Sequence, residues 1–203
     1  MKEFWNERYK ATSYAYGEAP NVYFENCLAQ LPAGKILLPA DGEGRNGVYA
    51  ATKGWYVDAF DISEEGQSKA TALAMKKNVS IHYSIADVNT IHLENEHYDA
   101  VALIYAHFHE NDRNRLHQKL NASLKVGGHV VLEAFSKNNL KYVAKNPKVG
   151  GPKDVSMLYS IEDLQSDFPN YKWIELYEKV VDLEEGEYHV GQGSVIRFLG
   201  QKL

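Results

Sequence analysis

The 203-residue chain is predicted to be an α/β protein with a doubly wound, seven-stranded, mostly parallel sheet and an antiparallel C-terminal hairpin. Three observations predict this fold. Five apolar runs typical of buried strands alternate with helical patterns over residues 35–135, a glycine-rich turn follows the first run, and two alternating runs come last. Because strand–helix–strand units are right-handed and place successive strands in one sheet, this alternation predicts a parallel sheet.

Composition favours a single domain spanning residues 1–203, since 44% of the residues are hydrophobic. The 22 basic and 27 acidic residues give a formal charge of -5, which argues against nucleic acid as a partner. Cys27 is the only cysteine, which excludes an internal disulfide and favours a reducing, cytoplasmic setting. No apolar run is long enough to span a bilayer, so no membrane contact is expected. We expect a monomer or a weak homodimer.

Residues 1–31 form an N-terminal arm rich in aromatic side chains. A short helix is predicted over residues 3–9, an aromatic loop follows, and an apolar helix is predicted over residues 22–31 before Pro32. Two interpretations of the aromatic rings stay open. They pack on the core of the domain, or they form a lid over a ligand.

A strand, a glycine turn and a helix start follow one another in the next segment. Residues 36–38 are an apolar run, glycines stand at positions 42, 44 and 47, and a helical pattern begins at Val48. Glycines let backbone N–H groups approach a ligand closely, and a helix N-terminus offers unpaired donors. The turn therefore predicts a binding site for an anionic or strongly polar group.

Two acidic residues end the next two predicted strands. Asp61 closes the alternating run 55–63 and follows Gly42 by 19 residues, the interval at which nucleotide-binding folds place a carboxylate against ribose hydroxyls. Asp87 comes just after the strand predicted at 79–83. Both acids are expected at the carboxyl edge of the sheet.

The remaining elements of the parallel part follow in order. Ser63 is an N-cap for a helix through Met75, because acidic residues occupy its first turn. Residues 98–105 are a continuous apolar run typical of a central parallel strand. A polar-faced helix is predicted over residues 113–124, and the fifth strand over residues 129–135. Residues 35–135 are thus interpreted as the cofactor-binding part.

Residues 138–203 differ in character and are assigned to the substrate side. Residues 138–154 predict a long loop with one helical turn near residues 140–143, and such loops are usually functional or mobile. Ser160 has capping-box spacing for a short helix. Residues 173–183 and 189–199 alternate as the two strands of an antiparallel hairpin.

Four motifs carry a resemblance to a known family: Trp5-Asn6-Glu7-Arg8-Tyr9, Tyr14-Ala15-Tyr16-Gly17-Glu18-Ala19-Pro20-Asn21, Gly42-Glu43-Gly44-Arg45-Asn46 and Phe60-Asp61-Ile62-Ser63. With the order of elements, they resemble class I S-adenosylmethionine-dependent methyltransferases, in particular the tellurite-resistance and thiopurine-methyltransferase-like branch. The resemblance implies a Rossmann-like methyltransferase fold whose seventh strand, residues 189–199, lies antiparallel beside the fifth. It also implies an enzyme of the EC 2.1.1 type.

The resemblance assigns the cofactor S-adenosylmethionine to the carboxyl edge of the sheet. The turn would lie under the methionine part, Asp61 would take the ribose hydroxyls, and Asp87 with Val88 would hold the adenine. The implied cofactor-binding residues are Tyr9, Tyr14, Ala40, Asp41, Gly42, Gly44, Asn46, Asp61, Ile62, Asp87, Val88, Tyr105 and Ala106.

The chain departs from the family pattern in the first strand. The family usually has an acid inside this strand and a glycine at the start of the turn, whereas Leu38 and Ala40 stand here. Asp41 is the nearest residue that could restore a carboxylate. The segment from Leu38 to Asp41 is therefore where this chain is expected to differ from its relatives.

Methyl transfer from a sulfonium needs alignment and exclusion of water, and at most one base. His107 follows the fourth strand and is the candidate base, and Arg45, His109 and Gly151 are candidate substrate contacts. A structural role ranks first for His109. The two histidines lack a third ligand at suitable spacing, so no metal site is predicted. The small-molecule acceptor, by family analogy, is a soft thiol, a chalcogen oxyanion or a similar heteroatom.

Two other functions stay open. The spacing Gly42-x-Gly44-x-x-Gly47 also matches the dinucleotide fingerprint, which would indicate an NAD(P)-binding oxidoreductase. A catalytically inactive cofactor-binding protein of the same fold is consistent with Leu38 and Ala40. No Asn-Pro-Pro-Tyr or Asp-Pro-Pro-Tyr stretch follows the fourth strand, and this absence disfavours methylation of nucleic-acid bases.

Overall fold

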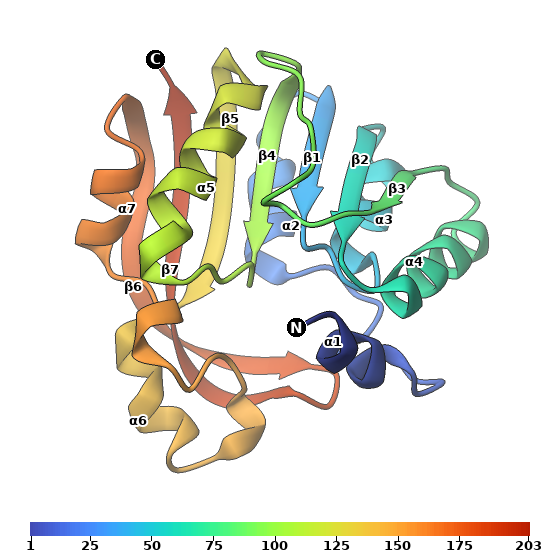
Figure 1. Cartoon of the computed structure of the whole chain (residues 1–203), viewed down its shortest axis with the longest axis vertical. Coiled ribbons are helices and arrows are strands. Elements are labelled where there is room, and N and C mark those ends of the chain that lie inside the picture. The colour runs from blue at the N-terminus through green and yellow to red at the C-terminus, as the bar shows by residue number, and fades with distance from the viewer.

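The computed structural model describes residues 1–203 and contains one seven-stranded sheet with the order β3-β2-β1-β4-β5-β7-β6 (Figure 1). The first five strands are parallel, and β7 runs antiparallel between β5 and β6. The predicted fold class is confirmed, including the antiparallel strand beside the fifth. The strands are β1 (Lys35–Pro39), β2 (Tyr56–Asp61), β3 (His82–Ile85), β4 (Tyr98–Ile104), β5 (Leu124–Phe135), β6 (Tyr171–Glu185) and β7 (His189–Lys202).

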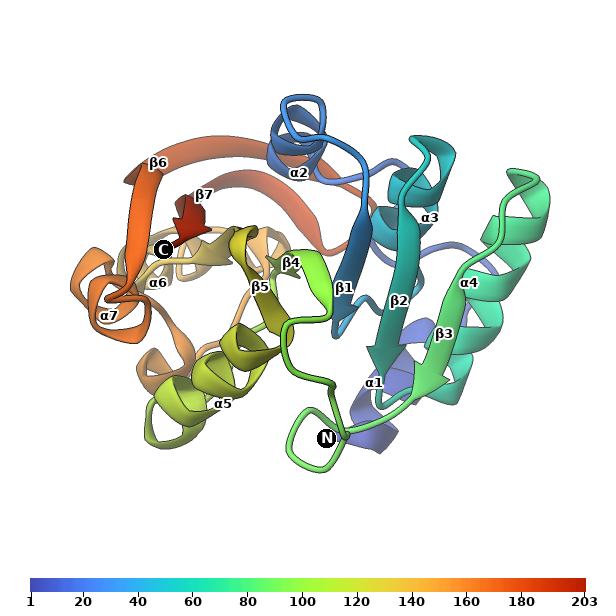
Figure 2. The ribbon, with the colours of Figure 1, turned by 90° about the horizontal axis from the view of Figure 1, so that it is seen from above.

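Helices cover both faces of the sheet, with α2 and α3 on one side and α5 on the other (Figure 2). Alternation along the strands explains the two layers, because successive side chains point to opposite faces. In β1, Leu37 packs into the core on the α5 side, whereas Ile36 and Leu38 pack into the core with α2. The helices are α1 (Lys2–Tyr9), α2 (Val22–Leu28), α3 (Arg45–Thr52), α4 (Glu64–Lys76), α5 (Glu110–Ser123), α6 (Leu140–Val143) and α7 (Ile161–Asp167).

Both predicted helix caps are present. The Ser63 hydroxyl accepts a hydrogen bond of 3.0 Å from the Gly66 N–H at the start of α4. Ser160 and Asp163 form the reciprocal capping box of α7. Each cap satisfies backbone donors that a helix start leaves unpaired, which is why these local signals can be identified in the sequence.

Several predicted element boundaries are wrong. The fifth strand begins at Leu124 instead of His129, helix α3 begins at Arg45 instead of Val48, and the two strands of the hairpin are longer than predicted. The third strand begins at His82 instead of Val79, because the Val79 N–H still bonds the Ala74 carbonyl at the end of α4. Helix α2 ends at Leu28, three residues before the predicted end. Helix α5 begins at Glu110, earlier than predicted, because the side chain of His109 caps its start.

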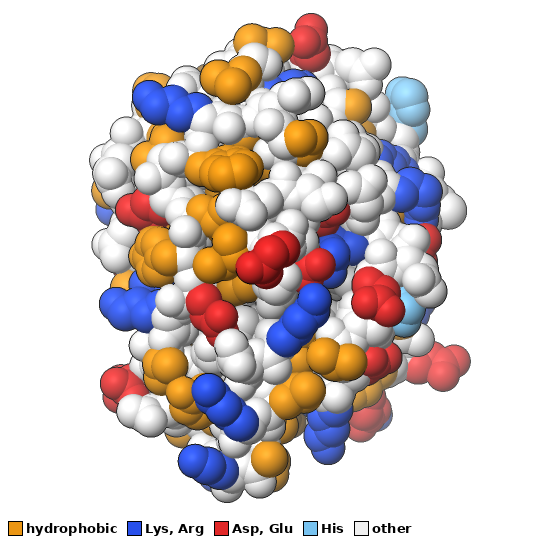
Figure 3. Space-filling model, turned by 90° about the vertical axis from the view of Figure 1, so that its left-hand side faces the viewer, with side chains coloured by type: hydrophobic (Ala, Val, Ile, Leu, Met, Phe, Trp, Pro, Cys, Tyr) orange, Lys and Arg blue, Asp and Glu red, His pale blue; other side chains and the backbone are white.

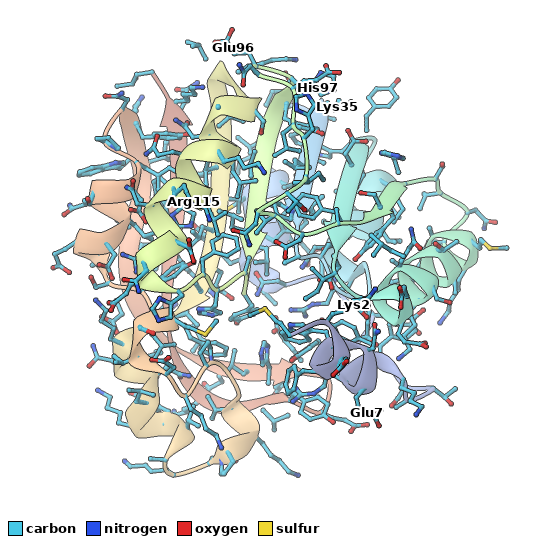
Figure 4. The ribbon with its side chains drawn as sticks, viewed as in Figure 1. Lys2, Glu7, Lys35, Glu96, His97 and Arg115 are labelled. Carbon is cyan, nitrogen blue, oxygen red and sulfur yellow. The ribbon has the colours of Figure 1, made fainter.

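The N-terminal arm and the tip of the C-terminal hairpin lie together beyond the carboxyl ends of the parallel strands (Figure 1). The Glu187 N–H at the hairpin tip donates to the Ala15 carbonyl over 2.9 Å. Helix α1 packs against α4, where Lys2 (labelled in Figure 4) forms a 2.6 Å ion pair with Glu64. Segments 174 residues apart, such as Ser13 and Glu187, therefore meet at this edge. None of the helices combines the length and the hydropathy needed to cross a membrane.

Candidate active site

The glycine turn connects β1 to α3 in left-handed backbone conformations. Ala40, Gly42 and Gly44 have φ values of 55°, 56° and 83°. Ala40 therefore adopts a conformation that glycine takes without steric cost, so the turn keeps its shape where the family usually has glycine. Gly44, the residue before α3, has no side chain to cap the helix, and Asp41 takes only the Gly47 N–H. The N–H groups of Arg45 and Asn46 remain available to a ligand.

Asp61 lies beside this turn at the end of β2. Its carboxylate accepts hydrogen bonds from the Gly42 N–H over 3.2 Å and from the Ser63 N–H over 2.9 Å. The side chain is buried, and burial raises its pKa above the ordinary value. A carboxylate has about four acceptor positions, so two remain for the hydroxyls of a ligand. The structure thus brings together the turn and the acid predicted to hold ribose.

Asp41 does not take the place of the acid that the family usually has inside the first strand. Its carboxylate accepts from the Gly47 N–H inside α3 over 3.1 Å, and burial raises its pKa to about 8. A neutral carboxyl group near pH 7 is a poor partner for an ammonium group. Asp41 therefore holds the start of α3, and the structure brings no other acid to the place of Leu38.

Two tyrosines enclose the turn. Tyr9 of α1 stacks on Trp5, and its hydroxyl would lie 2.6 Å from a Cβ added at Gly42. The Tyr83 hydroxyl donates to the Gly42 carbonyl over 2.6 Å. Tyr83 escaped the sequence analysis because it lies within a strand pattern and gives no separate signal.

Other predicted cofactor contacts are spread along the same edge. Asp87 is exposed, and its carboxylate accepts from the Asn89 backbone and side chain, each over 2.8 Å. Tyr14 lies elsewhere, because its hydroxyl donates to the Lys69 carbonyl of α4 over 3.1 Å. The remaining predicted contacts follow strand ends: Ile62 after β2, Val88 after β3, and Tyr105 and Ala106 after β4.

A buried polar network joins α2, β5 and β7 next to Tyr105. Glu133 of β5 accepts from the Asn21 side chain over 2.6 Å and from the Tyr105 hydroxyl over 2.9 Å. Its second oxygen pairs with Arg197 of β7 over 2.6 Å. The Asn46 side chain accepts from the Asn21 N–H over 2.9 Å and adds α3 to the network. The only sequence signal for Glu133 is an acid inside an otherwise apolar run.

Arg45, predicted as a substrate contact, has a partner within the protein. Its guanidinium pairs with Glu185 over 3.0 Å and donates to the Tyr16 carbonyl over 3.3 Å. The guanidinium of Arg45 and the carboxylate of Glu185 are both largely buried. Burial alone would raise the pKa of Glu185, but the hydrogen bond from His189 and the charge of Arg45 lower it to about 2. The charge of Arg45 is therefore neutralised before any ligand binds.

His189, at the start of β7, is a functional candidate that the sequence analysis missed. Its Nδ1 donates to Glu185 over 2.9 Å, and its Nε2 has no hydrogen-bond partner within the chain. The ring packs against the rings of Tyr16, Tyr105 and Phe135, with centroids 4.5, 4.4 and 5.2 Å away. Burial lowers the pKa of His189, which favours the neutral imidazole that can accept a proton.

Gly151 places the 138–154 segment on this aromatic cluster. It has a φ of 90°, and a Cβ at this position would lie 2.6 Å from Cδ2 of Phe135. Any larger residue would push the segment away from the ring. Gly151 thus lies on the ring of Phe135, which packs against His189, and the neighbouring Gly150 lies against His189 itself.

His107 and His109, the two histidines that follow β4, both make hydrogen bonds to backbone groups of the protein. His107 Nδ1 donates to the Met157 carbonyl over 2.8 Å, and its Nε2 accepts from the Phe135 N–H over 3.3 Å. His109 is exposed, and its Nδ1 accepts from the Asn111 N–H over 3.2 Å at the start of α5. Both ring nitrogens of His107 are hydrogen-bonded within the protein, and His109 lies exposed at the start of α5. His189 therefore replaces His107 as the candidate base.

Acid is expected to destabilise the fold through His107. Burial lowers its pKa from 6.5 to about 4, so the unfolded chain binds the proton first as the pH falls. The stabilisation is complete above about pH 6.5 and is lost progressively towards about pH 4. Urea denaturation across this range should show a smaller loss for His107→Gln than for the parent chain. His109→Gln is the matched control at an exposed ring, and equal losses in all three proteins would contradict the assignment.

A comparison with protein families finds a match over the part of the chain that contains the glycine turn. Residues 36–128 match a family model described as a methyltransferase domain. The matched region contains the glycine turn, Asp61 and Asp87, and it stops before the hairpin that carries His189. A search of curated proteins gives no match.

Three solved structures share the fold over most or all of the chain. One, from a study of the conversion of a disulfide bond into a thioacetal group during echinomycin biosynthesis, has a TM-score of 0.79 at 18% identity, covering 100% of this chain and 92% of its own. TehB from Haemophilus influenzae has a TM-score of 0.72 at 17% identity, covering 100% and 67%. A SAM-dependent methyltransferase from Methanosarcina mazei has a TM-score of 0.69 at 18% identity, covering 91% and 99%. Residues 36–128 thus match a methyltransferase domain, and the solved structures show that the chain has the fold of SAM-dependent methyltransferases.

Proposed function

We propose that the protein transfers a methyl group from S-adenosylmethionine to a small molecule. The observation that carries the proposal is the buried Asp61 carboxylate hydrogen-bonded to the Gly42 N–H, at the carboxyl edge of a methyltransferase-type sheet. This pairing supports the proposal, because a carboxylate that could accept from ribose hydroxyls lies beside a turn suited to the close approach of a ligand.

The residues present fit the cofactor. Asp61 would bind the ribose hydroxyls, the free N–H groups at the start of α3 would face the methionine end, and Asp87 with Val88 would border the adenine. Tyr9 covers the turn, so its ring would exclude water from the bound cofactor.

The bound cofactor would supply an activated methyl group, and the chain would supply orientation and a proton acceptor. Tyr105, in a left-handed conformation at the end of β4 with φ of 54°, is held by Glu133. His189 lies against Tyr105, and its neutral Nε2 would accept the proton of the acceptor's nucleophilic atom. Glu185 would keep Nδ1 protonated and so fix the tautomer.

Two observations favour a soft acceptor, such as a thiol or a chalcogen oxyanion. Aromatic rings surround His189 and provide a polarisable, largely apolar environment. The N-terminal motifs resemble the tellurite-resistance and thiopurine-methyltransferase-like branch, and one solved structure of the same fold concerns the conversion of a disulfide into a thioacetal.

A thermal-shift comparison tests the cofactor. At 100 times its dissociation constant, a ligand adds about 2.7 kcal/mol of stability, which for a domain of this size raises the melting temperature by roughly 5–10 °C. We expect this rise with S-adenosylmethionine or S-adenosylhomocysteine and none with NAD or NADP. The reverse pattern would instead support the oxidoreductase that the glycine spacing also allows.

Incubation with methyl-labelled cofactor then separates an enzyme from an inactive binding protein. A panel of thiols, selenite and tellurite should yield a labelled product for at least one acceptor. Cofactor binding without turnover on this panel would contradict the soft-acceptor assignment and leave the cofactor assignment intact.

A further inference from the structure

Strand β6 is a long edge strand with exposed apolar side chains. It has 15 residues, is the last strand in the sheet order and pairs only with β7. Trp173, Ile174 and Val180 are 43%, 47% and 45% exposed. Figure 3 faces the side where β6 and α7 lie in Figure 1 and shows hydrophobic side chains gathered among scattered charges. Such an edge presents unpaired backbone groups that can pair with another strand.

The regular part of β6 begins at Glu175, because a bulge lies between Trp173 and Glu175. From there side chains alternate, so Glu175, Tyr177 and Lys179 share one face of the sheet. Glu175 identifies this face, since its carboxylate accepts from the Tyr23 hydroxyl of α2 over 3.0 Å. This face, which α2 partly covers, therefore carries an acid, an aromatic ring and a base, with Lys179 the exposed member.

We propose that a second copy of this chain docks on β6 as an antiparallel strand, with Tyr177 at the two-fold axis. In this register Glu175 faces Lys179 of the partner subunit, and symmetry repeats the pair with the roles exchanged. Each cross-strand pair of opposite charge stabilises the contact.

The other symmetric registers are less favourable. An axis through Glu175 places Glu175 opposite Glu175 of the partner subunit, and an axis through Lys179 does the same for Lys179. Like charges directly opposite are destabilising. Centring it on Leu176 or on Glu178 gives neither charge an opposite partner. Only the register centred on Tyr177 pairs both charges.

Sedimentation velocity of the full chain, from about 1 to 100 µM, tests the proposal. We expect a concentration-dependent dimer. Lys179→Glu should weaken it about tenfold or more, because each of the two pairs then sets one acid against another. Adding Glu175→Lys to this variant exchanges the charges and should restore the dimer to within a few-fold.

Lys145→Glu makes the same change of charge at an exposed site in the 138–154 segment and should leave the dimer unchanged. Melting temperatures of all variants establish that they are folded. A parent chain that stays monomeric over this range would overturn the proposal, because the charges would then act only to protect the edge. A dimer indifferent to Lys179→Glu would overturn it as well.

Discussion

Replacing Asp61 by alanine is expected to weaken the binding of S-adenosylmethionine by more than tenfold. A hydrogen bond to a charged group contributes about 1.5–3 kcal/mol, and about 1.4 kcal/mol corresponds to a factor of ten. The variant also loses the bonds from Gly42 and Ser63, so the turn that would lie under the methionine part is released. Isothermal titration calorimetry of the parent chain and the variant measures the two affinities directly.

Asp99→Ala is the matched control for this experiment. Asp99 accepts from the Lys35 N–H over 2.8 Å at the opposite edge of the sheet, so the same substitution removes a comparable backbone contact away from the site. Its affinity for the cofactor should stay within about twofold of the parent value. Unchanged affinity in Asp61→Ala, with the variant folded, would show that the ribose lies elsewhere.

The sheet is largely predictable from the sequence because its signals are local. Continuous apolar runs such as residues 98–105 and caps such as Ser63 and Ser160 depend on neighbours within a few residues. The boundaries that differ depend on competition between elements. Val79 could extend a strand or close a helix, and its hydrogen bond to Ala74 decides for the helix.

The cofactor side of the site is predictable for the same reason, since Gly42 and Asp61 stand at fixed places in successive strand–helix units. The acceptor side is not. His107 looks like a free histidine in the sequence, and only the contact with Met157, 50 residues away, shows that it is occupied. Glu133 and Arg197 likewise find each other across 64 residues, through the antiparallel pairing of β5 and β7.

His189→Gln is expected to lower kcat by about 10²- to 10⁴-fold, the usual contribution of a general base, on whichever acceptor of the panel turns over. Glutamine keeps much of the volume of the ring but cannot accept a proton at neutral pH. The affinity for S-adenosylmethionine should be unchanged, because Asp61 and the glycine turn hold the cofactor. Single-turnover kinetics with labelled cofactor separate the chemical step from binding.

The pH profile distinguishes a base from a structural ring. Burial lowers the pKa of His189, so the parent rate should stay high through neutral pH and fall only in acid, and this limb should vanish in His189→Gln. Glu185→Gln should give an intermediate loss, since the amide can still accept from Nδ1 but stabilises the imidazolium less. His82→Gln, at an exposed ring of β3, serves as the control. A parent-like rate in His189→Gln would mean that the acceptor reacts without a protein base and that alignment beside Tyr105 supplies the catalysis.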